Sequence, residues 1–290
     1  MGAGKRGTAK SKSPPAMRLL HRETGTLMHI FDSDTALAEK ESRIFDGTVS
    51  GNWLVNGNPN GGYLMAIAAR AMLLHADRRS TPIVTANYIA RSAPGPVQVR
   101  VEEISRSKQF NRFEARMFQD GKETIRALGT FADEKIDCRV ERYETRAPGM
   151  PPVEDCVRVP ALPKFTLLDN LDMRLDPACA GWMQGKLADR SEQRGWIRFT
   201  QERPFDLPGI FLAADALPPA VFVSQGIAAW VPTIELTVNI RNLPQTEWLR
   251  CALRTRFITC GLLEADGEVW DGEGNLIAIS RQIAQFRTAG

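Results

Sequence analysis

Two short segments carry the residue types that could do chemistry on a bound ligand. The first is the turn-forming cluster Asn56-Gly-Asn-Pro-Asn-Gly-Gly62, where glycine lets the backbone approach a ligand closely. A helix-forming run follows, so the N–H groups of Gly61 and Gly62 could face an oxyanion. The second is Asp215, whose carboxylate could take a proton or a hydrogen bond from water. The simpler interpretations are glycines that a turn needs for steric reasons and a surface or helix-capping aspartate.

Other catalytic arrangements find no support in the sequence. The three histidines (His21, His29 and His75) form no nucleophile–base pattern, so a Ser-His-Asp hydrolase is disfavoured. The glycines at 57, 61 and 62 lack the spacing of a phosphate or dinucleotide loop. The five cysteines are scattered and contain no Cys-Xaa-Xaa-Cys pair, so we expect no metal site. Their odd number also favours a reducing cytoplasm over a disulfide framework.

The elements that must position these residues begin with a helix. Residues 62–75 are rich in Ala, Leu and Met, which have good helix propensity. Arg70 is their only charge, so the helix must be buried on most faces. It is shorter than the roughly 20 residues that cross a bilayer, and we expect no membrane span. The sequence therefore predicts a central helix wrapped by a sheet.

The strands of that sheet are predicted by a partial repeat between the two halves. An Arg-Xaa-Xaa-Pro element occurs at Arg91 to Pro94 and again at Arg241 to Pro244, each after an alternating segment that predicts a strand. Further strand-like runs follow at 97–102, 113–118, 248–253 and 276–283. Turns between runs are expected at Asp120-Gly121, Asp266-Gly267 and Gly272-Glu-Gly274. The pattern predicts a duplicated domain of the α+β class, in which each half ends as an antiparallel meander.

Composition narrows the possible partners. With 43% hydrophobic and 24% charged residues, the chain is neither a disordered nor a membrane protein by composition. Six basic residues precede the first acidic residue, Glu23, and without them 31 basic residues face 34 acidic ones. A body with a formal charge of −3 argues against a nucleic-acid partner, which would need a clustered basic surface.

Five segments together resemble the acyl-CoA thioesterase II (TesB-like) family over roughly residues 40–290. They are Asn60-Gly-Gly-Tyr63, Ala214-Asp-Ala216, Val231-Pro-Thr-Ile-Glu-Leu-Thr237, Glu247-Trp-Leu249 and Ser280-Arg-Gln-Ile283. The resemblance implies an α+β double hot-dog fold, in which two tandem antiparallel sheets each wrap a central helix. We expect a disordered basic tail at 1–22, an N-terminal hot-dog domain at 23–146, a Pro-rich linker at 147–163 and a C-terminal hot-dog domain at 164–290.

The resemblance also implies an activity and a set of site residues. Family members hydrolyse an acyl-CoA to a free acid and coenzyme A, and an Asp, a Thr and a Gln hold the attacking water. Those positions fall here on Asp215, Thr233 and Gln282. Gln282 shares one face of its strand with Leu276, Ala278 and Ser280, and that face is expected to look inward. The alternatives are a core glutamine satisfied by backbone and a plain β-branched strand threonine.

No cofactor beyond the coenzyme A of the substrate is implied, and no metal. This chain lacks a His that the bacterial prototype has in the strand after the Thr, so chain-length preference does not carry over. Arg91, Arg106, Lys108 and Arg112 could meet the coenzyme A phosphates, although solvated strand edges look the same. Sheet edges need covering, so we expect a homodimer or higher homo-oligomer, in the cytoplasm and in fatty acid metabolism.

Two other functions remain open at the level of sequence. A hot-dog hydratase or dehydratase would act on the same kind of thioester, but such enzymes pair an Asp with a His, and no His stands near Asp215 in the sequence. A non-catalytic acyl-CoA or lipid-binding protein would keep the pocket without the turnover.

Overall fold

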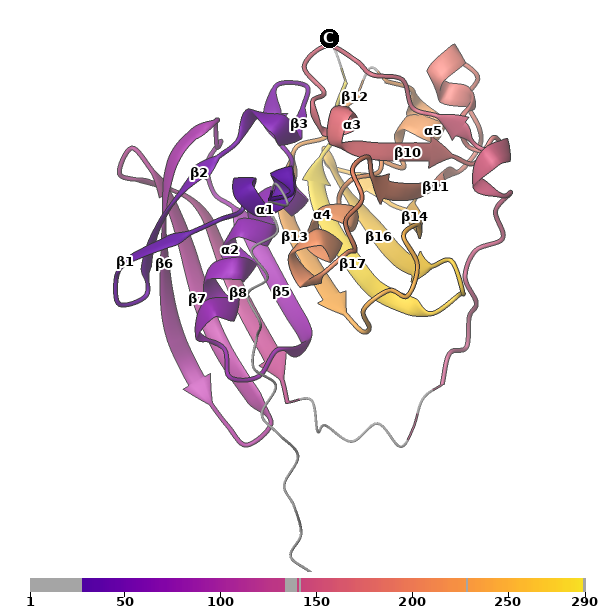
Figure 1. Ribbon diagram of the computed structural model, residues 1–290. Coiled ribbons are helices and arrows are strands. Elements are labelled where there is room, and N and C mark those ends of the chain that lie inside the picture. Colours follow the sequence, from indigo (N-terminus) through magenta and orange to yellow (C-terminus); the bar gives the residue numbers. More distant parts are fainter. Residues whose placement is uncertain (1–27, 134–139, 141, 228, 289–290) are drawn as a thin grey trace, which may run out of the picture.

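The computed structural model describes residues 28–133, 140, 142–227 and 229–288. The expected disordered tail at 1–22 lies outside these residues. The dominant feature is a 14-stranded antiparallel sheet whose main path runs β1-β2-β6-β7-β8-β5-β13-β17-β16-β14-β11-β10-β9. The predicted α+β double hot-dog fold is confirmed. Each half contributes a run of antiparallel strands to this one sheet and a helix that packs against it (Figure 1).

The first half runs from α1 to β8. Its elements are α1 (Ile30–Asp34), β1 (Ala38–Glu41), β2 (Ile44–Val49), the 3-10 helix η1 (Gly51–Trp53), β3 (Leu54–Val55), β4 (Asn58–Pro59), α2 (Gly61–His75), β5 (Ser80–Tyr88), β6 (Gly95–Arg106), β7 (Phe110–Gln119) and β8 (Lys122–Ala132). The Asp120-Gly121 turn joins β7 to β8 as predicted, with both residues at positive φ.

The second half repeats this plan with more short elements. They are η2 (Val153–Asp155), β9 (Val157–Arg158), α3 (Leu167–Asn170), β10 (Leu171–Leu175), η3 (Gly181–Gln184), β11 (Ser191–Phe199), α4 (Leu207–Ala213), α5 (Phe222–Gln225), β12 (Ala229–Trp230), β13 (Thr233–Ile240), β14 (Leu249–Thr255), β15 (Ile258–Thr259), β16 (Leu262–Asp271), β17 (Leu276–Gln285) and β18 (Arg287–Thr288).

The two halves join through their equivalent strands. β5 pairs with β13 antiparallel, and Thr85 lies opposite Thr237. The hydroxyls of these two threonines are 2.9 Å apart across the junction. Because the junction strands are the same two alternating segments that marked the repeat, the pairing makes one continuous sheet from two halves.

Helix α2 is buried as its composition predicted. Its residues from Gly62 to Met72 are buried apart from Arg70, because β5 to β8 cover one side and α4 the other (Figure 1). Arg70 reaches the edge of this layer, where its guanidinium lies 3.2 Å from Asp32. In the described ranges no helix has both the length and the apolar character needed to cross a membrane.

One expected turn is wrong. Asp266 and Gly267 lie inside β16, where Gly267 pairs with Ser280 of β17 and with Leu253 of β14. A Cβ added at Gly267 would lie 2.2 Å from the Ser280 hydroxyl oxygen, so the glycine lets the Ser280 and Leu253 side chains pack closely across the sheet. The hairpin turn before β16 is formed by Cys260 and Gly261, both at positive φ.

The proline-rich segment packs along the outside of the second half. Trp196 donates its indole N–H to the carbonyl of Pro151 at 3.0 Å, and Arg250 donates to the carbonyl of Pro148 at 3.2 Å. Farther along, the two residues of β9 pair with β10 at the sheet edge. The four domain boundaries drawn from the sequence stay a prediction.

A buried arginine ties the two halves together. Arg203, whose side chain is 6% exposed, donates twice to Asp32 of α1, at 3.0 and 2.8 Å. It also donates to Asp206, the N-cap of α4, at 2.7 Å, and its guanidinium lies over the rings of Phe31 and Phe199. The segment before α2 is thereby held against the second half.

We expect Arg203→Met to lower the free energy of unfolding by about 2–4 kcal/mol. The variant removes the hydrogen bonds of Arg203 to two partly exposed carboxylates, leaving Asp32 with Arg70 alone, and it removes the stacking on both phenyl rings. Urea denaturation measures the loss. Arg142→Met, which removes an exposed pair with Glu144, is the control and should change stability by less than about 0.5 kcal/mol. Equal effects of the two variants would contradict the assignment.

Candidate active site

The site is centred on the first turn of α2. Asn60 is the N-cap of this helix, and its side-chain oxygen accepts a hydrogen bond from the N–H of Tyr63 at 2.9 Å. The Asn58–Pro59 strand β4 delivers the chain to this cap, which places Gly61 and Gly62 in the first helical turn. The turn cluster singled out in the sequence thus becomes a helix start facing the second half.

Asp215 comes from the second half and meets this helix start. It lies two residues beyond the end of α4, and α5 begins only at Phe222, so Asp215 caps no following helix. Its Oδ2 accepts from the N–H of Gly62 at 2.9 Å and from the Asn60 amide at 3.2 Å. The same amide donates to the Asp215 backbone carbonyl at 2.9 Å. Hydrogen bonds from the first half therefore hold the carboxylate of Asp215, which belongs to the second half.

Both glycines are required by this close approach. A Cβ at Gly61 would lie 2.9 Å from Oδ2 of Asp215, and one at Gly62 would lie 2.5 Å from the carbonyl oxygen of Phe211. The space around both glycines is thus limited by Asp215 and α4, which is a steric constraint of a different kind from the turn considered in the sequence. The oxyanion role of Gly61 and Gly62 stays a prediction, since in this structure the N–H of Gly62 is donated to Asp215.

Gln282 and Thr233 complete the cluster. The Gln282 amide donates to Oδ1 of Asp215 at 3.0 Å and to the hydroxyl oxygen of Thr233 at 2.5 Å. Gln282 lies on the face of β17 that also carries buried Ala278 and Ala284, so the expected inward orientation is confirmed. Its partners are side chains of the site instead of backbone groups of the core.

A β-bulge decides which way Thr233 points. In β13, Leu236 pairs with Gln282 and Glu235 pairs with Ile283, but Thr233 pairs with Ala284 because the register shifts between Thr233 and Glu235. A regular strand would put Thr233 on the same face as Glu235, which is opposite to Leu236 and Gln282. The extra residue reverses that orientation and turns the hydroxyl toward the Gln282 amide.

Opposing effects set the charge state of Asp215. Burial raises the pKa of this carboxyl to about 6, although hydrogen bonds from the N–H groups of Gly62 and Gly61 and from the amides of Asn60 and Gln282 lower it. Desolvation outweighs the four donors. The group is therefore ionised at neutral pH but close enough to its pKa to take up a proton, as a general base must.

Tyr88 lies beside this carboxylate. Its hydroxyl donates to the carbonyl of Gly61 at 2.7 Å, and burial together with the charge of Asp215 holds its pKa well above the ordinary value. The phenol is thus neutral and stabilises the first turn of α2.

Sequence reasoning named neither Tyr88 nor Asn60 as a site residue. The N-cap position before Gly61 was a usable signal for Asn60, whereas nothing local marks Tyr88.

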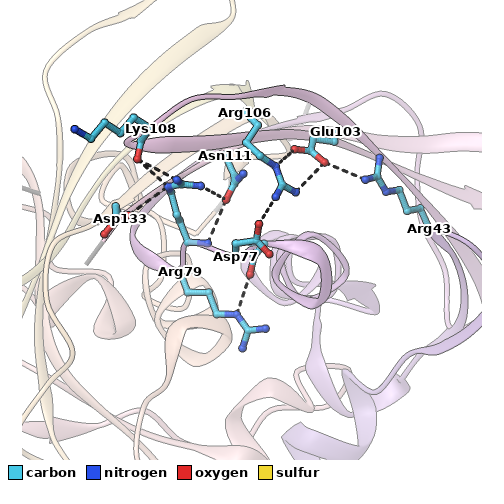
Figure 2. A network of polar contacts seen from close by, with 10 residues as sticks. Arg43, Asp77, Arg79, Glu103, Arg106, Lys108, Asn111 and Asp133 are labelled. Atoms are coloured by element: carbon cyan, nitrogen blue, oxygen red, sulfur yellow. Dashed lines mark hydrogen bonds and ion pairs between the residues drawn. The ribbon is translucent and has the colours of Figure 1, made fainter. Parts of the chain in front are cut away.

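Some of the basic residues considered for phosphate binding already form ion pairs or hydrogen bonds within the protein. Figure 2 shows Arg106 between Glu103 and Asp77, and Arg43 on the other side of Glu103. The hydrogen bonds from Arg106 lower the pKa of Glu103. Lys108 gives its backbone carbonyl to Arg78, and Arg91 donates to Asn58. Arg106 is therefore neutralised by two carboxylates, which weakens its case as a phosphate ligand.

Comparison with known families identifies the chain. Residues 49–132 match the acyl-CoA thioesterase N-terminal domain, and residues 145–286 match the acyl-CoA thioesterase C-terminal domain. The chain belongs to the acyl-CoA thioesterase family. The resemblance drawn from the five sequence segments is thereby confirmed. No curated protein sequence matches this thioesterase.

Solved structures share the whole fold. A candidate thioesterase II from Thermobifida fusca is 25% identical with a TM-score of 0.83, covering 90% of this chain and 99% of that one. A hot-dog protein from Alicyclobacillus acidocaldarius is 23% identical with a TM-score of 0.82, covering 91% and 100%. An acyl-CoA thioesterase II from Mycobacterium marinum is 16% identical with a TM-score of 0.71, covering 90% and 99%. The latter two likenesses establish the fold alone.

The hydratase or dehydratase alternative has weaker support. A dehydratase domain of curacin polyketide synthase shares the fold at 11% identity and a TM-score of 0.55, covering 89% of this chain and 98% of that one. The side chains that hydrogen-bond to the Asp215 carboxylate in the described structure are both amides, from Asn60 and Gln282. Among the described residues, no histidine therefore pairs with Asp215 as such an enzyme would require.

Proposed function

We propose that this thioesterase hydrolyses its acyl-CoA by direct attack of water, with Asp215 as general base and with Gln282 and Thr233 orienting the water. The observation that carries the proposal is one amide, that of Gln282, lying 3.0 Å from Oδ1 of Asp215 and 2.5 Å from the hydroxyl of Thr233. A base and two orienting groups around one point are what activation of a water requires.

The reaction balances without a covalent intermediate. The water oxygen bonds to the thioester carbonyl carbon while its proton passes to Oδ1 of Asp215. The tetrahedral oxyanion then collapses, the C–S bond breaks, and the proton returns to the departing thiolate. Protonation of Asp215 weakens its hydrogen bond from Gly62, because a neutral carboxyl is a poorer acceptor. The N–H groups of Gly61 and Gly62 can then turn to the oxyanion.

No step of this sequence calls for a metal or an organic cofactor, so coenzyme A enters only as part of the substrate. We also place the enzyme in the cytoplasm and in fatty acid metabolism. The described cysteines support a reducing compartment, since Cys156, Cys179, Cys251 and Cys260 are all free thiols.

A homodimer or higher homo-oligomer is part of the proposal. The outer face of the central strands carries three partly exposed apolar side chains, Ile83 at 38%, Leu128 at 53% and Ile279 at 43%. Apolar groups on an open sheet face favour burial against another surface. Sedimentation equilibrium should give a mass above the 32.2 kDa of one chain, and a mass equal to it would contradict the proposal.

Thiol release from a panel of short, medium and long acyl-CoAs tests the activity. We expect turnover of at least one acyl-CoA, with free acid and coenzyme A formed in equal amounts. Addition of water across the enoyl bond of an unsaturated acyl-CoA, with no thiol released, would instead favour a hydratase. Tight binding of acyl-CoA without either product would favour the binding protein.

The pH profile provides a further prediction. Because the pKa of Asp215 is raised to about 6, kcat/KM should fall about tenfold per pH unit below pH 6 and level off above it. Initial rates between pH 4 and pH 9 measure the midpoint, with circular dichroism to confirm that the protein stays folded. A midpoint near about 4, the ordinary value for aspartate, would contradict a buried base.

A further inference from the structure

Asn60 joins two tasks in one side chain. Its residue is 6% exposed, and both polar ends of the amide have partners in the described structure. The oxygen accepts from the N–H of Tyr63 and so caps α2. The nitrogen donates to Oδ2 and to the backbone carbonyl of Asp215. Asn60 thus caps α2 in the first half and also holds Asp215, the proposed base from the second half; we call this second role the clamp.

This clamp makes the two oxygens of Asp215 unequal. Oδ2 receives both the Asn60 amide and the N–H of Gly62. In the part of the chain that the structure describes, Oδ1 receives the amide of Gln282, which also reaches Thr233. A carboxylate oxygen with two donors has little capacity left for a water, whereas Oδ1 retains lone pairs on the side of the orienting groups. The geometry therefore assigns Oδ2 to anchoring and Oδ1 to chemistry.

We propose that Asn60 is a positioning residue for hydrolysis, which fixes Oδ2 of Asp215 so that Oδ1 faces the water held by Gln282 and Thr233. This inference rests on the proposed function of the site. Without the amide donor of Asn60, Oδ2 loses one of its hydrogen bonds and the carboxylate is less restrained against rotation. Displacement of Oδ1 from the attacking water by a fraction of an ångström removes much of the rate acceleration that a general base provides.

Electrostatics supports the same role. The hydrogen bond from Asn60 favours the ionised form and is one of the contributions that lower the pKa of Asp215 against its burial. Loss of this donor should move the pKa farther up. Tyr88 is the titratable group that contacts the site, and it is neutral. The other titratable groups on the surrounding elements are engaged elsewhere or lie on the outer face: Tyr63 with Asp34, Arg70 with Asp32, His75 with Glu39, Asp206 with Arg203, Arg281 with Asp266, and Glu235.

The variant Asn60→Ser separates the clamp from the cap. Serine is an equally good N-cap, so α2 keeps its first hydrogen bond, but serine offers no amide to reach Oδ2. We expect kcat to fall by about 10- to 100-fold, and the acid limb of the pH profile to move up by about 0.5 to 1 pH unit. Asn60→Asp keeps the cap and adds a like charge beside Asp215, so its limb should move up farther.

Asn242→Ser is the matched control. Its amide also donates to a backbone carbonyl, that of Leu276 at 2.9 Å, but Asn242 lies two residues beyond the end of β13 that is opposite to Thr233. The control should keep both the rate and the pH profile of the parent. If Asn60→Ser keeps both the rate and the midpoint of the parent, Asn60 only caps the helix and the inference is overturned. If Asp215→Asn keeps full turnover, the proposed function itself fails, whatever Asn60→Ser does.

Discussion

Asp215→Asn should lower kcat/KM for acyl-CoA hydrolysis by about 10³-fold, within the range that a general base contributes. The asparagine can still accept hydrogen bonds from Gly62 and Asn60, so the grip on the helix start survives. It cannot take the proton of the attacking water. Thiol release under kcat/KM conditions measures the loss, and a decrease of less than tenfold would remove Asp215 from the role of base.

Stability provides the control for this variant. Burial raises the folded-state pKa of Asp215 above the ordinary value of an aspartate, so its protonated form favours folding. That contribution is complete below about pH 4 and is lost as pH rises through about 6. Ionised Asp215 therefore lowers stability at pH 8, by at most about 3 kcal/mol. The asparagine variant should melt no lower than the parent at pH 8. A lower melting temperature would mean that lost activity reflects damage to the fold.

Gly62→Ala is the second substitution with a large expected effect. Its Cβ would lie 2.5 Å from the carbonyl oxygen of Phe211 and 2.9 Å from Cβ of Asp215, and both positions are fixed by α4 and its turn. The helices α2 and α4 must move apart to admit it. We expect the free energy of unfolding to fall by about 2–3 kcal/mol. We also expect kcat/KM to fall by about 10²-fold, because the base moves with the turn that follows α4.

Denaturation and thiol release on the same preparation measure both effects. Gly149→Ala is the control, since an added Cβ there meets no heavy atom within 4 Å. It should leave the rate unchanged and the free energy of unfolding within about 0.5 kcal/mol of the parent. A Gly62→Ala protein with parental rate and stability would show that the two helices are not in fixed contact.

The site owes its character to its location between the two halves. Asn60, Gly62 and Tyr88 come from the first half, whereas Asp215, Thr233 and Gln282 come from the second. Arg203 holds these halves together at the N-terminal end of α4, whereas Asp215 follows its C-terminal end. Arg203 contacts no site residue in the described structure. A substitution of Arg203 should nevertheless lower the rate of hydrolysis, because it changes the distance between α2 and α4.

The sequence by itself determined the regular elements and the chemistry available. An apolar run with one arginine can only be a buried helix, and α2 is one. The alternating segments at 83–91 and 233–241 predicted β5 and β13: β13 matches to within one residue, whereas β5 begins and ends three residues earlier than its segment. The five segments that resemble the thioesterase family also named Asp215, Thr233 and Gln282, which the structure brings together.

Only the tertiary structure decided how these residues meet. Local pattern placed a turn at Asp266-Gly267, but pairing with two neighbouring strands keeps both residues in β16. Strand alternation cannot tell that a bulge reverses Thr233, because a bulge depends on the partner strand. Nor could it show that Asn60 and Gly62 grip a carboxylate some 150 residues away. Those contacts exist because β5 pairs with β13, and that pairing is a long-range event that short-range propensity does not contain.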